Sequence, residues 1–376
     1  MVYEARCAIS ASMTSLGTDT KEAIPSAELG RAWYLNLVTP QIYELPNLTI
    51  SKSRQKMAFD QGSIAFIGLG VMGYPMATNL RKKIGSNRIL IVYDINQAAT
   101  NRFQLQTKGF GPVKIVGTAY EALQEADVVF TMLPSDSAVK SVYLDPESGL
   151  FAAAEAARTT GTRKLLVECG TVAQATISEV SQRSKDYNVT FIDAPVSGGP
   201  MGSEAGTLSF MVGCSEALFP SVKGLLSPMG TEDSIFRCGE VGSGTAFKII
   251  NNYISIISIL SVSEALNIAD KMDLDMRLLV DLINISSGQC WVSSNNNPVP
   301  GIHPNAPASH NYEGGFRIEL AEKVLRLGSE LAESVGAPTY LDKTALEVYG
   351  AAKSRYAGKD ARVVYKWLSE LSKSNP

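Results

Sequence analysis

Histidine is nearly absent from this chain, with only His303 and His310 among 376 residues. Both lie in one proline-rich stretch, and neither has an acidic residue or a cysteine at metal-ligand spacing, so no metal site is predicted. The five cysteines are scattered and odd in number, and they form no CxxC pair. This argues against a disulfide framework and for a reducing compartment.

An excess of either charge is lacking too. The chain has 34 basic and 37 acidic residues, interspersed, for a net charge of −3. We therefore expect no nucleic acid and no anionic membrane surface as a partner. The longest uncharged apolar stretch, residues 249–263, is short and rich in Ser and Asn, which argues against a bilayer span. The remaining composition, 45% hydrophobic, is that of a soluble globular protein of two or three domains.

The first 61 residues differ from the rest because they show no clear periodicity before a sharp strand signal at Ser63. A transit peptide is rich in Arg and poor in acids, whereas basic and acidic residues balance here. We interpret residues 1–61 as a separate extension, either disordered or a targeting segment, and the sequence leaves both open.

A glycine-rich turn lies between a predicted strand at 64–67 and a predicted helix at 75–83. A second strand, 88–94, ends in an acid 21 residues after the last glycine. This is the full dinucleotide-binding pattern, in which one glycine permits the turn, the next admits the pyrophosphate and the last lets helix pack on strand. The predicted cofactor-binding residues are Gly68, Leu69, Gly70, Val71, Met72, Gly73 and Asp94.

The acid at the end of the second strand indicates which of the two nicotinamide cofactors is bound. Asp94 should accept from the adenosine ribose hydroxyls, and the next basic residue is Arg102. With no cation expected beside the ribose, NAD is favoured over NADP.

Three further strands are predicted at 125–134, 164–168 and 190–195. Ligands of doubly wound sheets bind beyond the carboxyl ends of the strands. That rule places Leu133, Pro134 and Thr171 at the cofactor, unless they are ordinary loop residues. The turn at Ser197, Gly198 and Gly199 offers consecutive N–H groups to a carboxylate, or is a plain glycine turn.

Lys248 opens a long apolar stretch without Pro or Gly that extends to Ala269. It predicts a helix that is hydrophobic all round and therefore buried. Lys248, Asn252 and Ser255 share one face, which indicates a site in a cleft. The alternative is a lysine that reaches solvent along its stem.

Only helices are predicted after Gly244, at 275–287 and from Phe316 on. The stretch 291–315 holds four prolines and predicts a long loop over the site. Lys323 falls on the apolar face of the helix predicted from Phe316, either at the edge of that face or facing the cleft.

These motifs resemble the β-hydroxyacid dehydrogenases, from about Ser63 to the C-terminus. The resemblance rests on the glycine turn through Leu80, on Asp193 to Gly199 and on Gly242 to Asn252. Segments 286–291, 297–301 and 311–316 are similar to the branch that acts on 3-hydroxyisobutyrate, and sister reductases and 6-phosphogluconate dehydrogenase lack them.

The resemblance implies an α/β fold: a Rossmann domain at 62–240 joined through the long helix to a helical substrate and oligomerisation domain at 241–376. It implies Lys248 as catalytic acid/base with Asn252 orienting the substrate, and Ser197, Gly198 and Gly199 on its carboxylate. Thr171, Leu133 and Pro134 would line the nicotinamide pocket, with Lys323 beside it contacting cofactor and substrate. The implied reaction is NAD-dependent oxidation of 3-hydroxyisobutyrate to methylmalonate semialdehyde in valine breakdown, by a mitochondrial dimer or tetramer. A cytoplasmic location is the alternative.

The sequence departs from the family at Val324, Ala138 and Glu168-Cys169-Gly170, where Asp, Asn and Asp-Ser-Ser are usual. These departures leave three alternatives open. One is a dehydrogenase for another short β-hydroxyacid. The second is a glyoxylate or semialdehyde reductase, and the third is a catalytically silent dinucleotide-binding protein.

Overall fold

The computed structural model describes residues 62–157 and 163–374. The N-terminal extension predicted at 1–61 lies outside the described residues. All described residues belong to one compact unit.

A nine-stranded sheet forms the first half, in the order β3-β2-β1-β4-β5-β6-β8-β7 with β9 beside β8. The strands from β3 to β6 run parallel, and β8 is antiparallel to β6 and β7. The predicted Rossmann-type fold class is thus confirmed. The strands are β1 (Ile64–Ile67), β2 (Leu90–Tyr93), β3 (Val113–Ile115), β4 (Val128–Thr131), β5 (Leu165–Glu168), β6 (Thr190–Asp193), β7 (Val196–Ser197), β8 (Leu208–Gly213) and β9 (Gly230–Gly239).

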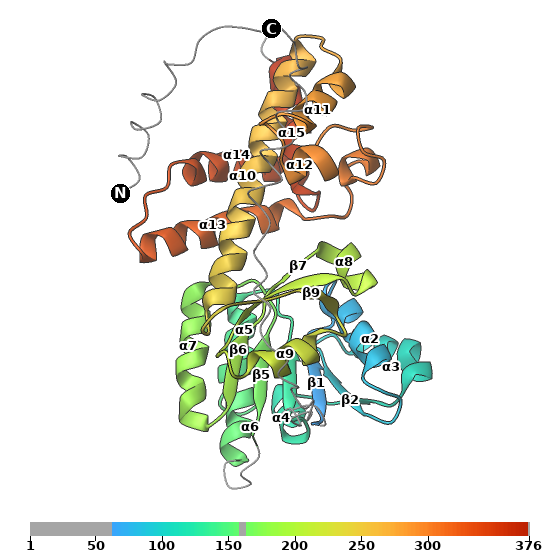
Figure 1. Cartoon of the computed structure of the whole chain (residues 1–376), viewed down its shortest axis with the longest axis vertical. Coiled ribbons are helices and arrows are strands. Elements are labelled where there is room, and N and C mark those ends of the chain that lie inside the picture. Colours follow the sequence, from blue (N-terminus) through green and yellow to red (C-terminus); the bar gives the residue numbers. More distant parts are fainter. Residues whose placement is uncertain (1–61, 158–162, 375–376) are drawn as a thin grey trace, which may run out of the picture. The chain divides into compact units, whose positions relative to one another are not determined.

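Helices cover both faces of this sheet (Figure 1). Alternate residues of β1 belong to two separate cores: Phe66 packs with α2, α3 and α9, and Ile67 packs with α4 to α7. The apolar run of each short strand is explained by this burial on both faces. The helices are α2 (Gly73–Lys83), α3 (Gln97–Thr107), α4 (Ala119–Glu125), α5 (Asp136–Leu144), α6 (Leu150–Ala156), α7 (Gln174–Ser184), α8 (Gly199–Ala205) and α9 (Phe219–Leu226).

The predicted long helix is α10 (Ser243–Lys271), of 29 residues. It runs from the sheet into the helical half (Figure 1). The prediction that it is buried all round is wrong. Ile256 and Ile259 are buried, but Ile250 and Ile254 are 54% and 62% exposed, because neighbours cover only one side. By length and composition alone α10 is long enough to cross a membrane, yet its buried side packs in the helical core, as the central helix of a folded domain does.

The helical half corrects two boundaries. The stretch 291–315, predicted to be irregular, opens with the short helix α12 (Trp291–Asn295), whose first turn is closed by a bond from the Cys290 N–H to Ser293 Oγ (2.9 Å). The helix predicted from Phe316 begins at Ile318, because the Phe316 N–H is bound by Asp360 (2.7 Å). The other helices are α11 (Met276–Asn284), α13 (Ile318–Ser334), α14 (Leu341–Tyr356) and α15 (Val364–Ser374), and among the described residues no strand follows β9.

Candidate active site

The glycine turn after β1 is shaped as the sequence predicts. Gly68 has φ of +95°, and a Cβ there would meet the Met132 carbonyl oxygen at 2.4 Å. A Cβ on Gly73 would lie 1.9 Å from the Gly68 carbonyl oxygen, so helix and turn touch. At Gly70 an added Cβ meets nothing within 4 Å. This open backbone precedes the start of α2, whose first turn has no side-chain cap, and the arrangement fits a pyrophosphate.

The end of β2 closes onto this turn. The Asp94 carboxylate accepts hydrogen bonds from the Leu69 N–H (2.5 Å) and from the Asn96 N–H (2.7 Å). Each carboxylate oxygen keeps a second lone pair for a ribose hydroxyl. The acid therefore lies at the turn, as an NAD site requires.

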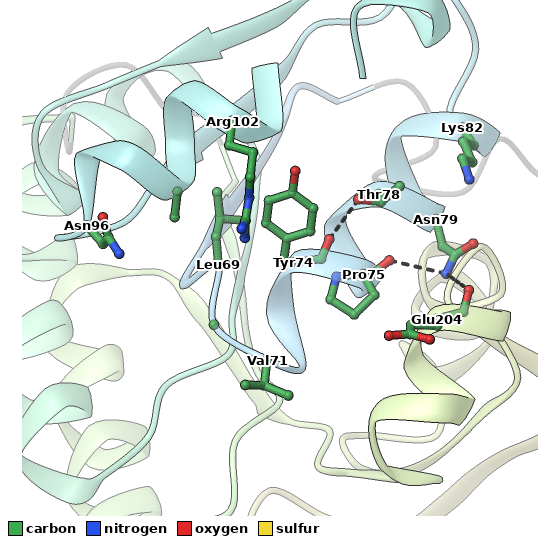
Figure 2. A pocket seen from close by; sticks show the side chains of 12 residues that line it. Leu69, Val71, Tyr74, Pro75, Thr78, Asn79, Lys82, Asn96, Arg102 and Glu204 are labelled. Atoms are coloured by element: carbon green, nitrogen blue, oxygen red, sulfur yellow. Dashed lines mark hydrogen bonds between the residues drawn. The ribbon is translucent and has the colours of Figure 1, made fainter. Parts of the chain in front are cut away.

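A cavity of about 610 Å³ extends from the turn along α2 and α3. Figure 2 shows the Arg102 side chain beside the Tyr74 ring, with Leu69 and Asn96 on the same side. The Arg102 guanidinium lies 4.6 Å from the Tyr74 ring centroid. Arg102 lines the same cavity as Asn96, because α3 brings residue 102 back to it. The expectation that no cation stands beside the ribose stays a prediction. The three-residue spacing of Asn96, Ala99 and Arg102 is the sequence signal that could have placed Arg102 at this cavity.

Lys248 lies in the second turn of α10 and is 7% exposed. Burial lowers the pKa of its ammonium to about 8, and among the described residues no neighbouring charge contributes. The alternative of a lysine that reaches solvent is therefore not supported. Asn252 and Ser255, on the same face, are half-buried.

Asp193, the last residue of β6, fixes the start of this helix. Its buried carboxylate accepts from the N–H groups of Gly242 and Thr245, each at 2.6 Å. Asp193 also precedes the turn at Ser197, Gly198 and Gly199 by a few residues. That turn has positive φ at both glycines, 133° and 63°, and both are exposed. Among the described residues no hydrogen bond joins the turn to Lys248 or Asn252; Asp193 and strand β8, which pairs with β7 at Ser197 and packs against Gly244, connect the two regions.

Lys323 on α13 reaches the sheet. Its ammonium donates to the carbonyl oxygens of Thr171 (2.6 Å) and Pro134 (2.9 Å). The predicted nicotinamide-pocket residues and Lys323 are thus brought together. Pro134 is exposed and Thr171 half-buried, whereas Leu133 is buried in the core. Val324, beside Lys323, packs in the helical core, which explains why an apolar residue is accommodated there.

Comparison with known proteins gives the family. The model for the NAD binding domain of 6-phosphogluconate dehydrogenase matches residues 63–242. The model for NAD-binding of NADP-dependent 3-hydroxyisobutyrate dehydrogenase matches residues 242–368. A Dictyostelium discoideum protein named probable 3-hydroxyisobutyrate dehydrogenase, mitochondrial, is 41% identical over 83% of this chain and 92% of its own length. The chain belongs to the 3-hydroxyisobutyrate dehydrogenase family.

The names of two further relatives mention L-serine. The NAD-dependent L-serine dehydrogenase of Pseudomonas aeruginosa is 37% identical over 81% of this chain and 96% of its own length. A solved Mycobacterium tuberculosis 3-hydroxyisobutyrate dehydrogenase with L-serine has a TM-score of 0.71 at 33% identity, covering 82% of this chain and 99% of that one. Family membership confirms the predicted enzyme class: the chain is an oxidoreductase with NAD as its cofactor.

Proposed function

We propose that this enzyme oxidises (S)-3-hydroxyisobutyrate with NAD to methylmalonate semialdehyde, a step of valine breakdown. The observation that carries the proposal is Lys248: a buried lysine with a pKa of about 8, on a helix that Asp193 fixes to the carboxyl end of a strand. A lysine with such a pKa is partly neutral at working pH and can serve as a base.

The remaining roles follow from placement. The turn at Gly68 to Gly73 would hold the pyrophosphate and Asp94 the ribose. Thr171, Pro134 and Leu133 would line the nicotinamide pocket. Lys323 would support this pocket through its hydrogen bonds to the Thr171 and Pro134 carbonyl oxygens. Ser197, Gly198 and Gly199 would hold the substrate carboxylate, because exposed consecutive N–H groups suit an anion. Asn252, one helical turn after Lys248, would orient the hydroxyl.

The reaction needs a base and a hydride acceptor. NAD, when bound, supplies the acceptor for the hydride that leaves the carbinol carbon. The neutral Lys248 amine takes the hydroxyl proton, so that the carbon–oxygen double bond forms as the carbon–hydrogen bond breaks. In the reverse direction the Lys248 ammonium returns this proton to the oxygen.

The runner-up substrate is L-serine, which the names of two relatives favour. Serine is also a β-hydroxyacid, and it places an ammonium where 3-hydroxyisobutyrate has a methyl group. Steady-state kinetics with both compounds, each with NAD and NADP, would rank them. A higher kcat/KM for serine would replace the proposed substrate and keep the chemistry.

Lys248→Ala tests the mechanism. Turnover should fall by about a thousandfold or more, the range expected for losing a general base together with its contacts. NADH affinity, read by fluorescence titration, should be unchanged. Lys271→Ala, an exposed lysine at the other end of the same helix, is the matched control and should keep full turnover. Near wild-type turnover in Lys248→Ala would reject the assignment.

We also propose a homo-oligomer, a dimer or tetramer, in the mitochondrion. The exposed apolar residues of α10 and α11, among them Ile254 (62%) and Leu278 (67%), support an interface. The name of the Dictyostelium relative supports the location. Sedimentation would test the oligomeric state, and imaging of a fluorescent fusion would test the location.

We also place the boundary between the Rossmann domain and the helical domain at residues 240/241, just before α10.

A further inference from the structure

Glu168 is the last residue of β5 and is fully buried. Its Oε2 accepts the hydroxyl of Thr131 (2.5 Å), the last residue of β4, and its Oε1 accepts the Gly170 N–H (2.7 Å). Thr131 and Glu168 are partners in the parallel register of the two strands. One carboxylate therefore joins the carboxyl ends of two neighbouring strands.

The two loops that follow these strands are packed against each other. A Cβ on Gly170 would lie 2.6 Å from Glu168 Oε1 and 2.7 Å from the Leu133 carbonyl oxygen. Only glycine admits the long carboxyl side chain and the neighbouring loop at this position. The next residue of each loop, Thr171 and Pro134, offers its carbonyl oxygen to Lys323.

We propose that Glu168 is a positioning residue of this enzyme: its carboxylate aligns the Pro134 and Thr171 loops for Lys323 and so shapes the nicotinamide end of the cofactor site. The inference rests on the proposed function, because that is where the two loops are assigned to the nicotinamide. Glu168 acts through these loops and is not itself a catalytic residue.

The carboxylate can change charge in the working range of pH. Burial raises the pKa of Glu168 to about 7, opposed by its bonds from Thr131, Gly170 and the Leu133 backbone and by the positive charge of Lys323. Tyr143 of α5 and Cys169 also face it, and Asp136 shares Lys323 with it. A protonated Glu168 could donate to Thr131, which could then donate to the Val167 carbonyl (3.3 Å). Both charge states are therefore satisfied, but only the charged one makes charge-assisted bonds.

Glu168→Gln tests this, because it keeps the shape and removes the charge. NADH affinity measured by fluorescence titration should be about tenfold weaker than wild type at pH 8, the size of one charge-assisted bond. The two affinities should converge at pH 6, where wild-type Glu168 is protonated. Wild-type affinity should thus fall as pH falls through about 7, and that of the variant should stay flat. A variant with wild-type affinity at pH 8, or with the wild-type pH dependence, would overturn the proposal.

Thr131→Val gives a second readout. It removes a bond to the charged carboxylate, so the midpoint of the NADH pH profile should move upward from about 7. Tyr143→Phe is the matched control: it removes the hydroxyl that lies 2.7 Å from Thr131 and leaves both Glu168 bonds in place. The midpoint of the Tyr143→Phe profile should stay at the wild-type value. The positioning role of Glu168 would be overturned if the Thr131→Val midpoint did not move, or if both midpoints moved equally.

Failure of the proposed function has a different signature. If wild-type protein binds no NADH, or binds it and turns over no β-hydroxyacid, the proposed function fails. If wild type does both and Glu168→Gln matches it at every pH, only the role of Glu168 fails.

Discussion

The Asp193 carboxylate accepts the Thr245 N–H at 2.6 Å, which ties the last residue of β6 to the first turn of the helix that carries Lys248. A second bond, from the Gly242 N–H, completes the cap. The free N–H groups at the start of a helix need such acceptors, and a negatively charged carboxylate there also interacts favourably with the helix dipole. The position of Lys248 is therefore set by a strand more than fifty residues earlier.

Asp193→Asn should loosen this start. The amide offers one acceptor and turns its NH₂ group toward the other donor, leaving a buried N–H unpaired at a cost of about 1–3 kcal/mol. We expect turnover to fall more than tenfold while NADH affinity is kept. Chemical denaturation and steady-state kinetics measure both effects, and wild-type turnover would contradict the positioning role.

Gly244→Ala should be among the most damaging glycine substitutions. Its Cβ would lie 2.1 Å from the Met211 carbonyl oxygen and 3.0 Å from Asp193 Oδ2. Since backbone must move, we expect a loss of more than about 2 kcal/mol in the free energy of unfolding. Gly350→Ala is the matched control in α14, where a Cβ meets nothing within 4 Å; it should be neutral or stabilising by up to about 1 kcal/mol.

Lys248→Met should raise the free energy of unfolding while turnover is lost. The native pKa of Lys248 is about 8, against an ordinary value of 10.5. Between these values the unfolded chain binds more protons, so wild-type stability rises with pH there, and the penalty is complete below about 8. The variant should gain up to about 3 kcal/mol at pH 7, shrinking above pH 8. Equal stability of the two proteins at pH 7 would contradict a buried Lys248 ammonium.

If the neutral Lys248 amine is the base, as proposed, the rate of alcohol oxidation should rise with pH through about 8 and then level off. Carbonyl reduction should show the opposite dependence. Rapid-mixing measurements of the first turnover, with saturating coenzyme, separate this step from coenzyme release. A rate of oxidation independent of pH between 6 and 9 would exclude Lys248 as the base.

Coenzyme preference should depend on Asp94 and Arg102 together. Asp94→Ala removes the proposed ribose acceptor and the repulsion that its charge would exert on a 2′-phosphate, while Arg102 still lines the cavity. We expect NADH affinity to fall about tenfold and NADPH affinity to rise. Adding Arg102→Ala should abolish the gain for NADPH. An NADPH gain that survives the double substitution would show that Arg102 takes no part.

The sequence predicted the architecture where local patterns are strong. Five short apolar strands, the glycine turn and the long helix were each visible, because burial on both faces of a parallel sheet demands unbroken apolar runs. Strands β3, β7, β8 and β9 were not predicted. Only Gly230 and Ile235 of β9 are buried, and its Thr, Glu, Asp and Ser residues give no core signal.

Contacts that depend on strand neighbours could not be predicted. Nothing local to Glu168 shows that Thr131 is its partner in register, or that Lys323 lies beyond them. Likewise, an apolar helix such as α10 does not show which of its residues a partner leaves uncovered. The residues that carry the proposed chemistry were found by motif, and the residues that position them required the structure.

The two hydrogen bonds that the Asp193 carboxylate accepts have a consequence for motion between the sheet and the helical half. Because they anchor the start of α10 to the sheet, Lys248 keeps its place beside the cofactor strands if the helical half rotates. Lys323 belongs to α13 and would leave Thr171 and Pro134 in the same movement. In such a rotation Lys248, the proposed base, would stay with the sheet, whereas Lys323 would move with the helical half.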